Sequence, residues 1–187
     1  MPGSSHPKPR RFRSPAAVPA AALLPLADAL NLDIKSLDES FYARQCGGAL
    51  TPVLRFARQA AGAGRRLEIT NLLIPGLNDS PEQVGRLAAW VAEHLGRRTP
   101  LHLSAYHPDY RMDLPPTSAA GLERAWTRAR QELDYVYVGN LPAAYGQDTH
   151  CPGCGETLVE RRGYAARRTG LRGRACARCG RPADLDL

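Results

Sequence analysis

The sequence lacks any apolar run near the length of a membrane-spanning helix. Such a helix needs about 20 consecutive apolar residues, and the apolar stretches of this 187-residue chain are much shorter. An integral membrane protein is therefore excluded. With 43% hydrophobic and 23% charged residues, the composition is typical of a soluble protein that can bury a real core.

Acidic residues are absent from residues 1–20, where four basic side chains give a net charge of +4. The segment is rich in Pro, Ser and Arg and has no helical or strand period, so we expect residues 1–22 to form a disordered basic leader. A cleavable secretory signal is an alternative, because an apolar stretch and an Ala-x-Ala at 27–29 follow the basic start. Pro19 and Pro25 interrupt that stretch, and a cytoplasmic location is favoured.

Aromatic residues are scarce at the other end of the chain, where Tyr164 is the only one in residues 151–187. The same segment holds eight arginines and a net charge of +4, while the chain between the two basic ends carries −1. A basic tail suits a binding module for nucleic acid or an acidic protein partner. Single-stranded nucleic acid is usually bound on several aromatic side chains, so nucleic acid is the less favoured partner.

Four short apolar segments predict strands that are buried on both faces; they cover residues 29–36, 66–75, 100–106 and 135–140. One amphipathic helical pattern lies in each interval: residues 49–63, a stretch beginning after Ser80, and residues 118–133. Ser80 and Gln83 have the spacing of a capping box, with Pro81 at the first helical position.

This alternation predicts an α/β fold with parallel strands and right-handed crossovers. Four strands in roughly 120 residues suit either a small doubly wound sheet or half of an eight-stranded barrel. We expect residues 23–148 to form a partial, half TIM-like βα barrel and residues 149–187 a zinc-ribbon-like appendage. The first strand would then present an unpaired edge, so the isolated chain is expected to aggregate or dimerise.

Two CxxC pairs, CPGC and CARC, dominate the appendage. Two such turns close a tetrahedral shell of four thiolates, which makes a structural zinc site the prediction for Cys151, Cys154, Cys176 and Cys179. Iron is one alternative, since thiolates alone do not select the metal, and free or disulfide-paired thiols are another. A segment of this size seldom folds on an apolar core, so the metal would fold it.

Polar residues near the ends of the predicted strands are candidates for a site, because barrel enzymes build their sites at the carboxyl ends of the strands. The candidates are Asp33, Lys35, Thr70, Asn71 and His107. All five side chains are expected to meet at the carboxyl-end opening of the barrel. A plain salt bridge between Asp33 and Lys35, and a loop role for His107, are the alternatives.

Several strings carry a family resemblance: NLDIKSLDESFYARQCGG, EITNLLIPGLNDS, LHLSAYHPDYRM, LPPT, YVYVGN and the two CxxC pairs. From about residue 23 onward, the chain resembles the C-terminal part of radical S-adenosylmethionine (SAM) enzymes related to pyruvate formate-lyase activating enzyme. More narrowly, it resembles the radical SAM enzyme of the AmmeMemoRadiSam system. The resemblance implies that Lys35 holds the methionyl part of SAM with Asp33 beside it, that His107 contacts the ribose, and that Thr70 faces SAM.

The sequence departs from this family in one respect. Radical SAM chemistry uses a [4Fe–4S] cluster held by a CxxxCxxC motif, and this sequence has only Cys46 outside the two CxxC pairs. The resemblance thus implies a C-terminal portion that is inactive alone and is completed by a separately encoded N-terminal half; a truncated gene or a decayed remnant are alternatives. Memo-like and AMMECR1-like proteins are the further partners that it implies.

Overall fold

A computed structural model describes residues 20–185. Most of the predicted leader, residues 1–19, lies outside the described residues. The described chain begins with the short helix α1 (Ala20–Leu23) and a 3-10 turn, Leu24–Leu26. Within the described range, no helix combines the length and the apolar character needed to cross a membrane.

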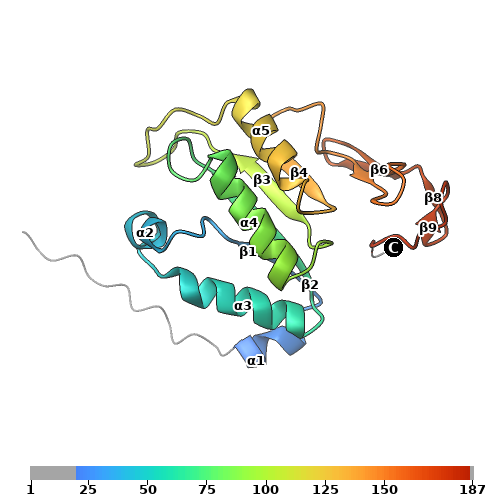
Figure 1. The fold of residues 1–187 in the computed structure, drawn as a ribbon, viewed down its shortest axis with the longest axis horizontal. Coiled ribbons are helices and arrows are strands. Elements are labelled where there is room, and N and C mark those ends of the chain that lie inside the picture. Colours follow the sequence, from blue (N-terminus) through green and yellow to red (C-terminus); the bar gives the residue numbers. More distant parts are fainter. Residues whose placement is uncertain (1–19, 186–187) are drawn as a thin grey trace, which may run out of the picture.

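The centre of the fold is a parallel four-stranded sheet (Figure 1). Its strands are β1 (Ala29–Asp33), β2 (Arg66–Leu73), β3 (Leu101–Ala105) and β4 (Val136–Gly139). They follow one another in the sheet in chain order, and every neighbouring pair is parallel. The four predicted strands are therefore confirmed, each a little shorter at its carboxyl end than the sequence suggested.

The three predicted helices are also present, as α3 (Leu50–Gly62), α4 (Pro81–His94) and α5 (Ala119–Ala129). The capping box is confirmed: the Gln83 N–H donates to Ser80 Oγ, and the Ser80 N–H donates to Gln83 Oε1, both at 3.2 Å. The sequence analysis missed a short helix, α2 (Glu39–Phe41), and the π-helical turn Tyr42–Cys46 that continues it.

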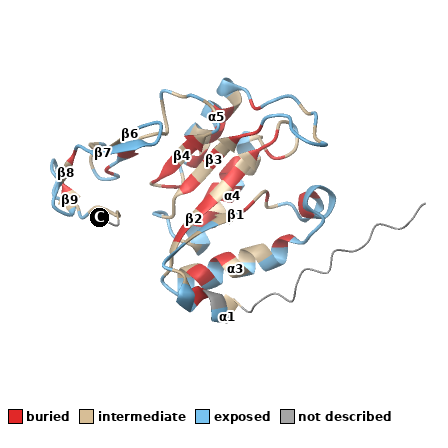
Figure 2. Cartoon of the chain, turned by 180° about the vertical axis from the view of Figure 1, so that it is seen from behind, coloured by how far each residue is buried: buried red, intermediate tan, exposed pale blue. Residues whose placement is uncertain are grey.

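Helices pack on only one face of the sheet. Along β2, buried residues alternate with half-buried ones, and Leu67, Ile69 and Leu73 join residues of all three helices in one core. Figure 2 shows the buried residues concentrated on the strands and on α4. The expectation of strands buried on both faces was thus wrong, because all three helices cover the same side.

This arrangement decides between the two predicted α/β folds. A doubly wound sheet reverses its strand order and places helices on both faces, whereas a barrel keeps the strands in chain order with all helices outside. The sheet here has the order β1-β2-β3-β4 with its helices on one side. The fold is a segment of a βα barrel, and the open face of the sheet corresponds to a barrel interior.

The two edges of the sheet differ. Along β4, the Val138 N–H donates to the Gly146 carbonyl and the Gln147 side chain donates to the Val138 carbonyl, so the loop after β4 covers that edge. Among the described residues, β1 pairs with β2 only. The predicted open edge is therefore present at β1.

The tail follows β4 and forms two small antiparallel sheets (Figure 1). The first contains β5 (Thr149–His150), β6 (Thr157–Arg162) and β7 (Ala165–Arg168), and the second contains β8 (Leu171–Arg172) and β9 (Ala175–Cys176). Its hydrophobic cluster has Leu158, Val159 and two of the cysteines as its buried members.

Candidate functional site

The two CxxC turns have the same backbone geometry. The Cys151 carbonyl accepts from the Gly155 N–H at 2.8 Å, and the Cys176 carbonyl accepts from the Gly180 N–H at 2.9 Å. Gly155 and Gly180 have φ of 76° and 74°, a left-handed conformation that glycine adopts without strain.

The four sulfurs of these turns converge on one point. All four lie within 4.8 Å of one another, and the Sγ atoms of Cys151 and Cys179, like those of Cys154 and Cys176, are 3.6 Å apart. A disulfide would bring two sulfurs to about 2.0 Å, so the disulfide alternative is excluded. A tetrahedral ion with bonds of about 2.3 Å holds its sulfurs about 3.8 Å apart. The cluster therefore fits a metal ion.

The protonation of these thiols is uneven without a metal. Backbone N–H groups of Cys179 and Arg178 lower the pKa of Cys176 to about 7. The Glu156 N–H lowers the pKa of Cys154, but burial and the three neighbouring sulfurs outweigh it and raise that pKa to about 12. Metal binding would displace the protons, as it does at thiolate sites in general.

A second group of polar residues lies on the open face of the sheet, at the carboxyl end of β1 and beside it on the middle of β2. Lys35 Nζ and Asp33 Oδ2 form an ion pair at 3.2 Å, and both side chains remain partly exposed. Asp33 lies next to Thr70 in the parallel register, and Thr70 Oγ1 donates to Asn31 Oδ1 at 2.9 Å. The structure thus brings Asp33, Lys35 and Thr70 together.

Asn71 does not belong to this group. Its side chain is 2% exposed and lies on the helix-covered side of β2, where Nδ2 donates to the carbonyls of Ile34 and Lys35. Asn78 also donates to the Lys35 carbonyl, at 2.6 Å. The expectation that five residues meet at the barrel opening was wrong for Asn71, whose amide fixes the backbone that carries Lys35.

His107 is exposed and follows β3 at the same end of the sheet. Its ring nitrogen Nδ1 lies 3.5 Å from the Pro108 carbonyl. In the described part of the chain, no hydrogen bond or ion pair joins it to Asp33, Lys35 or Thr70. The four positions share the carboxyl-end edge without forming one hydrogen-bonded network.

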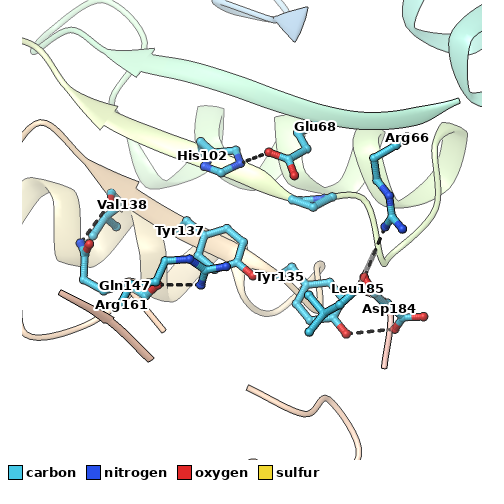
Figure 3. Close-up of a pocket in the computed structure, with 12 residues that line it drawn as sticks. Arg66, Glu68, His102, Tyr135, Tyr137, Val138, Gln147, Arg161, Asp184 and Leu185 are labelled. Atoms are coloured by element: carbon cyan, nitrogen blue, oxygen red, sulfur yellow. Dashed lines mark hydrogen bonds and ion pairs between the residues drawn. The ribbon is translucent and has the colours of Figure 1, made fainter. Parts of the chain in front are cut away.

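The sequence analysis missed a cleft of about 500 Å³ between the amino-end half of the same face and the tail (Figure 3). On its sheet wall, His102 Nε2 and Glu68 Oε2 are 2.7 Å apart, and His102 stacks on Tyr137 with ring centroids at 5.3 Å. The hydrogen bond from His102 lowers the pKa of Glu68. Polar residues at every second position of the strands, as in RLEIT and LHLSA, were the available signal.

The tail contributes the opposite wall of this cleft. The Arg161 guanidinium lies 5.3 Å from the centre of the Tyr137 ring, and Tyr137 Oη and Thr149 Oγ1 are 2.8 Å apart. Asp184 accepts hydrogen bonds from Arg98 at 3.0 Å and from Tyr135 at 2.9 Å. The tail is therefore docked onto the sheet, beside the amino ends of the strands.

No family model matches the chain. An uncharacterized protein of Methanocaldococcus jannaschii is 41% identical over 164 residues, which cover 86% of this chain and 49% of that protein. The chain therefore spans about half the length of this curated relative.

Among solved structures, a domain of pyruvate-formate lyase-activating enzyme from Bacteroides vulgatus is similar with a TM-score of 0.57 and 20% identity, over 65% of this chain and 73% of that one. A radical SAM methyltransferase from Sphaerobacter thermophilus gives a TM-score of 0.49 and 19% identity, over 64% and 37%. The first likeness shows the fold alone: the four-stranded sheet and its helices share the α/β fold of that domain.

Proposed function

We propose that this chain is the carboxyl-terminal part of a radical SAM enzyme of the activating type, and more narrowly of the AmmeMemoRadiSam system. The observation that carries the proposal is the Asp33–Lys35 ion pair beside Thr70, on the open face and at the carboxyl ends of the strands. In barrel enzymes that edge is where sites are built. Memo-like and AMMECR1-like proteins and a cytoplasmic location remain part of this proposal through the family resemblance.

The residues present have the right chemistry for SAM. The Lys35 ammonium suits the carboxylate of the methionyl group, and Asp33 holds that ammonium in place until the ligand arrives. His107, exposed at the end of β3, suits a ribose hydroxyl. In enzymes of this class, a [4Fe–4S] cluster supplies the electron that cleaves SAM, and the 5′-deoxyadenosyl radical then abstracts hydrogen from the substrate.

The cluster ligands have to come from another polypeptide segment, because the sequence has no CxxxCxxC motif. The open edge of β1 is where such a segment would add a parallel strand. The covered edge of β4 leaves no equivalent position on the other side. We therefore propose that this chain is inactive alone and that its partner extends the sheet from β1.

Zinc is the proposed ion of the four-cysteine cluster, with a structural role. Its four thiolates fill a tetrahedral shell and leave no position for a substrate. The alternative of a nucleic-acid-binding tail is less favoured, because Arg162, Arg167 and Arg178 already pair with carboxylates.

SAM binding tests the proposal. The chain is mixed with the portion of the Methanocaldococcus jannaschii relative that lies outside the matched residues, and SAM affinity is measured by equilibrium dialysis under anaerobic conditions. Lys35→Gln should weaken binding at least about tenfold, the loss expected for a charge-assisted hydrogen bond. Arg55→Gln, on the exposed side of α3, removes a charge far from the open face and should have no effect.

Two results would overturn the proposal. One is a mixture that forms a complex and does not bind SAM. The other is a Lys35→Gln variant that binds SAM as tightly as the unaltered chain. Formation of 5′-deoxyadenosine after addition of dithionite, by the mixture and not by the chain alone, is the result expected for the split enzyme.

A further inference from the structure

The cleft between the sheet and the tail is distinct from the proposed SAM site. It lies at the amino-end half of the open face, whereas Asp33, Lys35 and His107 lie at the carboxyl ends. Its volume of about 500 Å³ is within the usual range for small-molecule pockets. Both the sheet and the tail supply its walls, as Figure 3 shows for Tyr137 and Arg161.

The two carboxylates of the cleft both have hydrogen-bond partners. Glu68 is hydrogen-bonded to His102, and Asp184 pairs with Arg98 and accepts from Tyr135. Both acids are thus held by neighbouring side chains, and the positive charge of Arg161 also helps to lower the pKa of Glu68.

Arg161 makes its own side-chain hydrogen bonds to uncharged groups. Its Nη1 donates to the Gln147 carbonyl at 3.1 Å and to Thr149 Oγ1 at 2.7 Å, and both acceptors are uncharged. Within residues 20–185, no carboxylate forms an ion pair with this guanidinium. The side chain is half-buried and packs on Tyr137, so its position is fixed before any ligand binds. A fixed guanidinium binds a planar anion at a reduced entropic cost.

We propose that this cleft binds a small organic anion, whose carboxylate or phosphate head pairs with Arg161 and whose apolar body lies against the Tyr137 ring. Pro100, Val138 and Leu185 also line the cleft and supply apolar surface for that body. The proposal does not depend on SAM binding, since it uses none of the residues of the carboxyl-end edge.

The test uses the full-length, metal-loaded chain and three fluorinated probes followed by ¹⁹F NMR. 4-Fluorobenzoate and 4-fluorophenyl phosphate carry the two possible heads, and 4-fluorobenzyl alcohol is the uncharged analogue. At least one anion should bind and the alcohol should bind at least about tenfold more weakly. The tighter of the two anions identifies the head group. Equal binding of the alcohol, or no binding of either anion, overturns the proposal.

Variants then locate the binding. Arg161→Gln should weaken the anion at least about tenfold, while Arg162→Gln, which removes the same charge one residue further along β6, should leave it within about twofold. The Arg161 side chain also hydrogen-bonds to Gln147 and Thr149, so its loss could disturb the local structure. Gln147→Glu therefore provides a second variant, which keeps the guanidinium and adds a carboxylate to the cleft lining. This variant should also lose most of the affinity. Unchanged affinity in Gln147→Glu, or equal losses in Arg161→Gln and Arg162→Gln, would contradict the assignment.

Discussion

Across the described residues 20–185, the four-stranded region buries twenty residues in its main core, whereas the cluster of the tail has four buried members, of which two are cysteines. The sheet and helices can exclude water by packing apolar side chains, and the tail has too few of them. A segment of that size normally needs a metal or disulfides to fold. The four-stranded region is thus stabilised by its core, whereas we expect the tail to depend on a metal ion held by its four cysteines.

Metal removal should give the largest difference between the two regions. Structural zinc sites bind with roughly 10–16 kcal/mol of apparent free energy, which is available for folding. Chelation, or Cys154→Ser, should therefore abolish hydrogen-exchange protection in residues 149–185 and leave α4 and β3 protected. Cys46→Ser is the control, because Cys46 is exposed and remote in sequence from the cluster. A tail that stays protected without metal would contradict this view.

Leu103→Ala should destabilise the four-stranded region and leave the metal content of the tail unchanged. Leu103 is fully buried at the centre of β3, and truncating a buried leucine costs about 2–5 kcal/mol. Denaturant unfolding should report that loss in the four-stranded region, while the metal content stays unchanged. Leu26→Ala, at a leucine that is 83% exposed, should cost much less. Equal losses for the two leucines would argue against the described core.

Ser80→Ala should destabilise only the four-stranded region, by about 1 kcal/mol, since it removes an N-cap. Ser118 offers a matched comparison: its Oγ accepts from the Gly121 N–H at 3.0 Å, but a glycine has no side chain to return the bond. The bond from the residue-80 N–H to Gln83 Oε1 survives Ser80→Ala, so we expect the two serine substitutions to cost similar amounts in chemical denaturation. A cost at Ser80 far below the cost at Ser118 would contradict the N-cap role of its side chain.

The smallest expected effect is a pH dependence at the boundary of the two regions. His102 lowers the pKa of Glu68 in the folded chain, while an unfolded Glu has a pKa of about 4.3. The stabilisation is thus present above the unfolded pKa and is lost as the pH falls through the folded pKa. Because both side chains are partly exposed, we expect less than about 1 kcal/mol. Glu68→Gln should remove this component from a series of unfolding curves below pH 5, and an unchanged pH profile would exclude it.

Much of the fold could be predicted from the sequence because its strongest features are local. Apolar runs, helical periods and the Ser80–Gln83 box identified every strand and long helix of the four-stranded region. The spacing of Cys151, Cys154, Cys176 and Cys179 likewise located the cluster of four sulfurs that fits a metal ion.

The cleft could not be predicted in this way. It depends on Arg161 meeting Tyr137, two residues whose contact is set by how the tail docks rather than by any local pattern. The inward direction of Asn71 was also missed, although the alternation along β2 carries it: Asn71 shares its face with the apolar Leu67, Ile69 and Leu73.

The contacts of Asp184 have a consequence for the order of folding. Its carbonyl accepts from Arg66 and its carboxylate from Arg98 and Tyr135, over sequence separations of 118, 86 and 49 residues. Pairing between successive strands closes loops of 32 to 37 residues, which are shorter than all three, and we expect it to form earlier. Asp184 also emerges from the ribosome only after all four thiols of the cluster. Its docking is therefore a late event in chain maturation, which follows assembly of the sheet.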